Sequence, residues 1–109
     1  MAYDKGLAER LMDLSTGMAG TSEKRMFGGW GLMLHGNLLI GVMGDEICAR
    51  VGVDAYEDAL AQPHARPFDF TKRPMKGWVY VSPDALESDE GLQTWFDRCH
   101  AFVSTLPKK

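Results

Sequence analysis

The sequence predicts an α+β fold, a two-layer sandwich in which a five-stranded antiparallel sheet carries helices packed on one face. Hydrophobic periodicity indicates the element order α-β-β-β-α-β-β-α, without the strand-helix alternation that builds a parallel sheet. Two helical segments have apolar stripes that need a large apolar surface, and only a sheet offers one here. A chain of 109 residues supports one hydrophobic core, so residues 1–109 are expected to form a single domain.

Residues 4–18 are expected to form an amphipathic first helix. Apolar side chains recur there at intervals of four, three and four, the period of one helix face. These apolar positions are Leu7, Leu11, Leu14 and Met18. The glycine-rich residues 17–22 should end the helix, and the charged residues 23–25 are expected to connect it to the sheet as a linker.

Residues 26–52 predict a meander of three strands, which is the centre of the fold. The first strand is expected over residues 26–34, the second over 38–43 and the third over 47–51. Turn residues separate them at 35–37 and 44–45. In the third strand, Ile47, Ala49 and Val51 alternate with polar or small residues, so one face should be buried.

The second half begins with a short helix that Asp54 is expected to cap and that Pro63 limits. Within residues 66–76, the alternation of Phe68 and Phe70 around Asp69 suggests a short edge strand at residues 68–71, which the flanking prolines Pro67 and Pro74 protect. This strand should pair with residues 77–82, which are rich in aromatic and β-branched residues. In that second strand Trp78 and Tyr80 should lie on one face, and Val79 and Val81 on the other.

The C-terminal segment predicts the longest helix. Ser82-Pro83-Asp84 is a helix start that opens either a brief turn or the final helix. An apolar stripe at helical spacing then extends from Leu92 to Leu106, and Pro107 is expected to end the helix.

Composition limits the function classes. With 12 basic and 15 acidic residues the net charge is −3, so direct DNA binding is not expected. No segment approaches the roughly 20 apolar residues needed to span a bilayer, and no signal peptide is apparent, so we expect a cytoplasmic protein without a membrane partner. Cys48 and Cys99 lack zinc-site or nucleophile spacing and are expected to be reduced, buried thiols. We expect no catalytic residue, no metal site and no cofactor.

Two features are candidates for binding. Gly28, Gly29 and Gly31 lie within a strand pattern and not before a helix, so we interpret them as structural, with phosphate contact as the alternative. Residues 66–76 hold four bases against Asp69, whereas residues 84–97 hold five acids and no base. A basic patch would suit an acidic protein or a phosphate, and a solvated loop is the alternative. The candidate partner-binding residues are Arg25, Arg66, Lys72, Arg73 and Lys76.

Three motifs together resemble the N-terminal domain of the TfoX/Sxy family of competence regulators. They are Met-Phe-Gly-Gly-aromatic-Gly at 26–31, the Pro67-Phe68 pair, and the strand 78–81 followed by Pro83. The terminal helix, with Trp-Phe-x-x-Cys-His-Ala-Phe at 95–102, extends the resemblance over nearly the whole chain. The family residues that carry over are structural: Met26, Phe27, Gly28, Gly29, Gly31, Phe68, Phe70 and Tyr80.

The resemblance implies the same two-layer fold and a regulatory role, with no catalytic residue. Longer family members carry a second, helical C-terminal domain and activate DNA-uptake genes together with the cyclic-AMP receptor protein. This chain is interpreted as a stand-alone N-terminal domain with no C-terminal domain. We therefore expect a non-enzymatic interaction domain that regulates transcription through a protein partner, with a transcription complex as one candidate and a homodimer as another. The alternative is a small-molecule or nucleotide-phosphate binder that uses the Gly-rich strand and the basic loop.

Overall fold

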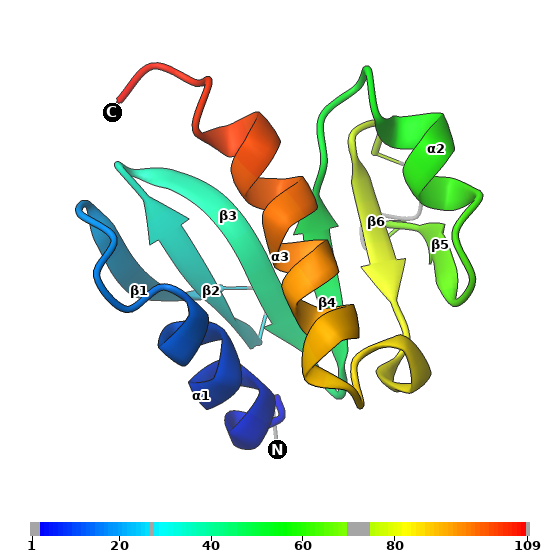
Figure 1. The fold of residues 1–109 in the computed structure, drawn as a ribbon, viewed down its shortest axis with the longest axis horizontal. Coiled ribbons are helices and arrows are strands. Elements are labelled where there is room, and N and C mark those ends of the chain that lie inside the picture. The colour runs from blue at the N-terminus through cyan, green and yellow to red at the C-terminus, as the bar shows by residue number, and fades with distance from the viewer. Residues whose placement is uncertain (1–2, 27, 70–74, 109) are drawn as a thin grey trace.

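A computed structural model describes residues 3–26, 28–69 and 75–108 and has the expected α+β architecture (Figure 1). Its sheet has six strands, not five, in the order β1-β2-β3-β4-β6-β5, and all neighbouring strands are antiparallel. Helices α1 and α3 lie across one face (Figure 1). The strands are β1 (Thr21–Met26), β2 (Gly29–Leu34), β3 (Asn37–Met43), β4 (Glu46–Arg50), β5 (Ala65–Pro67) and β6 (Trp78–Val81). The helices are α1 (Lys5–Leu14), α2 (Tyr56–Leu60), η1 (Pro83–Ala85) and α3 (Asp89–Val103).

The additional strand, β1, comes from the segment expected to be a linker. Met26 is the last residue of β1 and lies opposite Gly29 in β2, so the two strands pair as a hairpin with two residues between them in the sequence. The single strand predicted over residues 26–34 is therefore wrong. β1 gives no apolar alternation because it lies at the rim of the sheet and residues 22–25 are all exposed.

Local interactions set the helix ends. Asp4 caps α1, its carboxylate accepting the N–H of Leu7 at 3.1 Å, and the helix ends at Leu14, not at residue 18. Gly17, with φ of +89°, turns the chain after it. The expected Asp54 cap is wrong, because α2 begins one residue later with Ala55 at its N-cap position and no side-chain bond there.

Ser82-Pro83-Asp84 opens only the single turn η1, the shorter of the two expected outcomes. Ser88 then caps α3, its hydroxyl accepting the N–H of Gly91 at 3.0 Å. The helix ends at Val103, before Pro107, so the expected proline stop is wrong. The hydroxyl of Thr105 donates to the carbonyl of Phe102 at 2.6 Å, satisfying one of the helix's last acceptors before the proline is reached.

An edge strand lies at the rim of the sheet and pairs with β6, as expected, but it spans Ala65–Pro67 and so precedes the predicted residues 68–71, of which residues 70 and 71 are not described. The backbone N–H of Phe68 extends the contact to the carbonyl of Trp78 at 3.4 Å. Phe70 lies outside the described residues.

The two faces of the sheet carry separate apolar clusters. The large core lies between the sheet and the helices and includes Leu11, Ile47, Val79 and Cys99, all fully buried. The opposite face carries a smaller cluster of Cys48, Phe68 and Tyr80, with Met43, Met75 and Trp78 packed against it. The predicted alternation in β6 is confirmed, with Val79 and Val81 in the large core and Trp78 and Tyr80 in the smaller cluster. Within the described ranges, no helix is long and apolar enough to cross a bilayer.

Candidate functional site

Arg66, a candidate partner-binding residue, is engaged by neighbouring side chains at the surface of the sheet. Its guanidinium donates to both carboxylate oxygens of Glu46, with Nη2 to Oε1 at 2.8 Å, and lies 4.5 Å from the centre of the Tyr80 ring. The hydrogen bond to Glu46 raises the pKa of Arg66. We call Arg66, Tyr80 and Glu46 the β5 clamp, because they connect β5, β6 and β4 in that order. The charge of Arg66 is neutralised within the clamp.

Arg25 lies on β1, at the opposite rim of the sheet. Its guanidinium is 5.9 Å from the centre of the Tyr3 ring. Four strands lie between β1 and β5, and at the usual strand spacing this separates the two rims by about 24 Å. Arg25 and Arg66 therefore do not share one basic patch.

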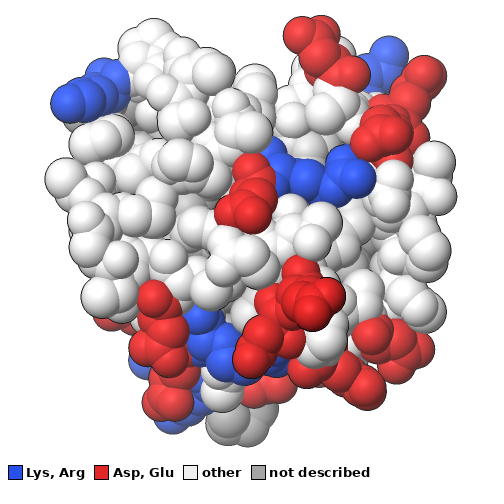
Figure 2. All heavy atoms as spheres, in the orientation of Figure 1, with Lys and Arg blue, Asp and Glu red and all other residues white. Residues whose placement is uncertain are grey.

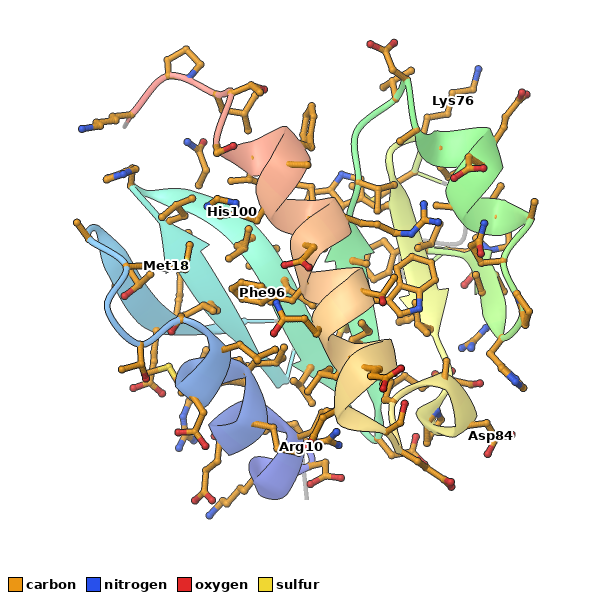
Figure 3. The ribbon with its side chains drawn as sticks, viewed as in Figure 1. Arg10, Met18, Lys76, Asp84, Phe96 and His100 are labelled. Carbon is orange, nitrogen blue, oxygen red and sulfur yellow. The ribbon has the colours of Figure 1, made fainter. Side chains whose placement is uncertain are left out.

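Of the other three basic candidates, the structure describes Lys76, which lies two residues before β6. Lys76 is exposed and projects beside α2 in Figure 3. Lys72 and Arg73 lie outside the described residues. The acidic segment that follows contains Asp84, which Figure 3 places at the other end of the molecule from Lys76. In Figure 2 acidic side chains gather at that end, where α1, η1 and the start of α3 meet. Of the bases in the predicted basic segment, the structure describes Arg66, which is paired with Glu46, and Lys76, so the predicted charge asymmetry stays a prediction.

Arg50, on β4, is largely used in packing. Its guanidinium lies 5.1 Å from the Trp78 ring centre and 5.7 Å from that of Phe102, and it donates to the carbonyl of Leu38 at 3.4 Å. Burial lowers its pKa from the usual arginine value. The aromatic contacts hold this cation between β6 and α3.

The glycines of the family motif have structural roles where the structure describes them. A Cβ on Gly29 would overlap the carbonyl oxygen of Val42 in β3, so close approach of a neighbouring backbone requires glycine. Gly28 has a φ of +74° in the connection between β1 and β2. Gly31 is buried and lies opposite Gly41. Phe27 lies outside the described residues. The structural interpretation of Gly28 and Gly29 is confirmed.

The thiols are free and buried, as predicted: Cys48 is 3% exposed and Cys99 is fully buried. Burial raises the pKa of Cys99 to about 12 and that of Cys48 well above its usual range. Both groups stay protonated at neutral pH, and the thiolate is the reactive form. This environment disfavours nucleophilic chemistry at either cysteine.

The outer edge of β1 is the feature that the sequence analysis missed. β1 runs for six residues and pairs with β2 on its inner side only, because it is the first strand in the sheet order. Glu23, Lys24 and Arg25 are exposed along it. The signal in the sequence was the polar segment 21–25, which lies between Gly20 and Gly28. The buried strand β2 begins directly after Gly28.

A shallow hollow lies where the end of α3 meets the β2–β3 turn. Its volume is about 390 Å³, and it is lined by His35 and His100 together with Ser104 and Lys108. Apolar side chains, including Met18, complete the lining. His100 projects from α3 toward the loop that carries Met18 (Figure 3) and stacks on Phe96 with 6.4 Å between ring centres. No carboxylate of the described residues lines this hollow, so its polar groups suit a small anion.

Comparison with known proteins assigns the family. The sequence model of the TfoX N-terminal domain family matches residues 13–103 of the chain. No curated protein and no solved structure gives a significant match. The match covers both the β1–β2 hairpin and the β5 clamp. Because it spans nearly the whole sequence, the chain belongs to the TfoX N-terminal domain family.

Proposed function

We propose that this protein is a non-enzymatic interaction domain that regulates transcription through a protein partner in the cytoplasm. The observation that carries the proposal is membership of the TfoX N-terminal domain family over residues 13–103. The resemblance of that domain to the competence regulators supports a partner in a transcription complex.

The geometry supports recognition more than chemistry. Arg66 and Arg50 are engaged with neighbouring side chains, and both thiols are buried and protonated. The β1 edge, in contrast, offers a six-residue backbone and exposed charges. An exposed strand edge can bind another chain through main-chain hydrogen bonds, and the side chains along it provide specificity.

The test is affinity capture of the tagged protein from its own cells, with mass spectrometry and transcript profiling of a deletion strain. We expect a component of a transcription complex to be enriched and a defined set of transcripts to change. Arg25→Glu and Lys76→Glu are matched charge reversals at two surfaces, and loss of the partner in one of them locates the contact. Capture of no transcription component, together with an unchanged transcript profile, would contradict the proposal.

A second function, binding of a small organic anion, is favoured by the hollow that His35 and His100 line. The small-molecule site is thus proposed at this hollow and not at the Gly-rich strand and basic loop, because the Gly-rich strand is packed against β3 and Arg66 is neutralised by Glu46. A thermal-shift screen with organic acids and nucleotides tests it. A ligand at about a hundredfold excess over its dissociation constant should stabilise the fold by about 2.7 kcal/mol, and His100→Ala should abolish the shift. The same shift in His100→Ala would exclude this hollow.

A further inference from the structure

The two rims of the sheet differ in how open they are to another chain. β5 has three residues and includes Pro67, which has no N–H to donate. β1 has six residues and no proline. Figure 1 shows β1 at the rim opposite β5. The unpaired edge of the sheet that is long enough to bind another strand is therefore β1.

The hairpin register determines which backbone groups of β1 point outward. Met26 and Gly29 flank a two-residue connection, so they form a hydrogen-bonded pair, and such pairs recur at every second residue. Lys24 and Ser22 therefore direct their N–H and C=O groups toward β2. Arg25 and Glu23 direct theirs outward, where no strand of the described ranges meets them.

The side chains of β1 restrict the partner further. Glu23 and Arg25 lie opposite Leu32 and Trp30, on the sheet face that α1 covers, and Lys24 lies on the other face. A two-fold axis perpendicular to the sheet keeps each face continuous between two copies. Opposed residues must then come from the same face, so the axis passes through a residue, and among the charged residues this is residue 23, 24 or 25.

The charges distinguish these three registers. An axis through residue 23 places the two Glu23 carboxylates opposite each other, and an axis through residue 25 does the same with the two Arg25 guanidinium groups, so both are repulsive. An axis through residue 24 places Glu23 opposite Arg25 of the second copy twice, and it pairs their outward backbone groups as well. The one like-charged pair in this register is Lys24 opposite Lys24 of the second copy, and these two side chains project into solvent on the other face.

Glu23 is already oriented for such a pair. Its Oε1 accepts the indole N–H of Trp30 at 2.8 Å, which holds the carboxylate at the rim. Trp30 itself is 3% exposed, so the group that positions Glu23 is part of the core. A carboxylate fixed in this way loses less side-chain entropy when it binds an arginine.

We infer that β1 pairs antiparallel with β1 of a second copy about a two-fold axis at Lys24, forming a homodimer with one continuous twelve-stranded sheet. The inference concerns self-association and does not depend on the proposed transcription partner. Surface ion pairs contribute little individually, so the dimer is expected to be concentration- and salt-dependent.

Disulfide trapping tests the register. At Lys24→Cys the two Cα atoms should lie about 4.5 Å apart, within the range that a disulfide spans. Ser22→Cys is the matched control, because it lies on the same face of the same strand, and in this register its two copies are about 13 Å apart. The native thiols are buried and do not compete. We expect Lys24→Cys to form the covalent dimer at least about tenfold faster than Ser22→Cys. Equal rates, or no dimer from Lys24→Cys, would overturn the inference.

Charge reversal gives an independent measurement on the unmodified edge. Arg25→Glu should weaken the dimer by about tenfold or more in sedimentation experiments, because carboxylates then oppose each other twice. The double variant Glu23→Arg/Arg25→Glu should restore association, since the opposed charges are again complementary. Circular dichroism and urea melts check that each variant folds. A wild-type protein that stays monomeric at high concentration contradicts the dimer, and affinity capture of a transcription partner would be unaffected by that result.

Discussion

The two rims of the sheet are stabilised in different ways. β1 is held by a backbone hairpin of six residue pairs, with Gly29 packed directly against β3 and with its charges exposed. β5 contributes only three residue pairs, and the clamp of Arg66, Tyr80 and Glu46 fastens it across two neighbouring strands. An arginine at the β5 rim is thus used for stability, whereas the arginine at the β1 rim is available to a partner.

Gly29→Val tests the backbone side of this comparison and should have the largest effect. Valine favours strands, so an ordinary strand position would accept it. Its Cβ would instead overlap the carbonyl oxygen of Val42, and overpacking of this kind costs about 3 kcal/mol or more. Urea melts measure the loss, with Ser22→Val on exposed β1 as the control at no more than about 0.5 kcal/mol. A midpoint for Gly29→Val equal to wild type would show that β1 and β2 are not held by close approach to β3. The double variant Lys72→Ala/Arg73→Ala should also change stability little.

Alkaline pH tests the burial of the two thiols, of which Cys48 lies in the cluster next to the β5 clamp and Cys99 in the large core. Thiols in the unfolded chain ionise near about pH 8.5, while burial raises the pKa of Cys99 to about 12 and that of Cys48 further. Because the folded-state pKa is raised, the stabilisation is complete below pH 8.5 and is lost as pH rises toward the folded value. At pH 10 each thiol should lower the free energy of unfolding by about 2 kcal/mol.

Urea melts at pH 8 and pH 10 measure this loss. Cys48→Ala and Cys99→Ala should each reduce the pH dependence, whatever their effect on stability at pH 8. Cys48 contributes from the cluster with Phe68 and Tyr80, and Cys99 contributes from the large core. Unchanged pH dependence in both variants would contradict the burial argument.

Removing the β5 clamp should have a smaller effect. Arg66→Ala deletes an exposed ion pair and the cover over the Tyr80 ring, and we expect a loss of about 1 kcal/mol. Glu46→Gln keeps one acceptor and should cost less. Thermal melts and hydrogen exchange of residues 65–67 measure the result. Hydrogen exchange that becomes faster in β1 but stays unchanged in β5 would contradict the role of the clamp in holding β5.

Lys24→Thr should have the smallest effect on the monomer and the opposite sign on association. Its side chain is exposed, so the free energy of unfolding should change by no more than about 0.5 kcal/mol. Removing the like-charge pair at the two-fold axis should tighten the dimer by about threefold. Sedimentation at several protein concentrations measures this. Weaker association would mean that Lys24 contributes an attractive contact and that the axis lies elsewhere.

The sequence by itself determined the features that depend on local periodicity. The stripes of α1 and α3, the alternation in β4 and β6, and the burial of both cysteines follow from the spacing of apolar residues, which a core of this size requires. The family motif also reported a true constraint, because Gly29 lies against a neighbouring backbone.

Only the tertiary structure decided what the polar residues do. β1 was missed because an exposed rim strand needs no apolar alternation, and Asp54 is not a cap because α2 begins one residue later. The five basic candidates looked like one patch in the sequence, yet Arg25 and Arg66 lie at opposite rims, and Glu46, twenty positions away, neutralises Arg66. The strand order brings such partners together, and charge-charge contacts between distant residues leave no periodic signal in the sequence.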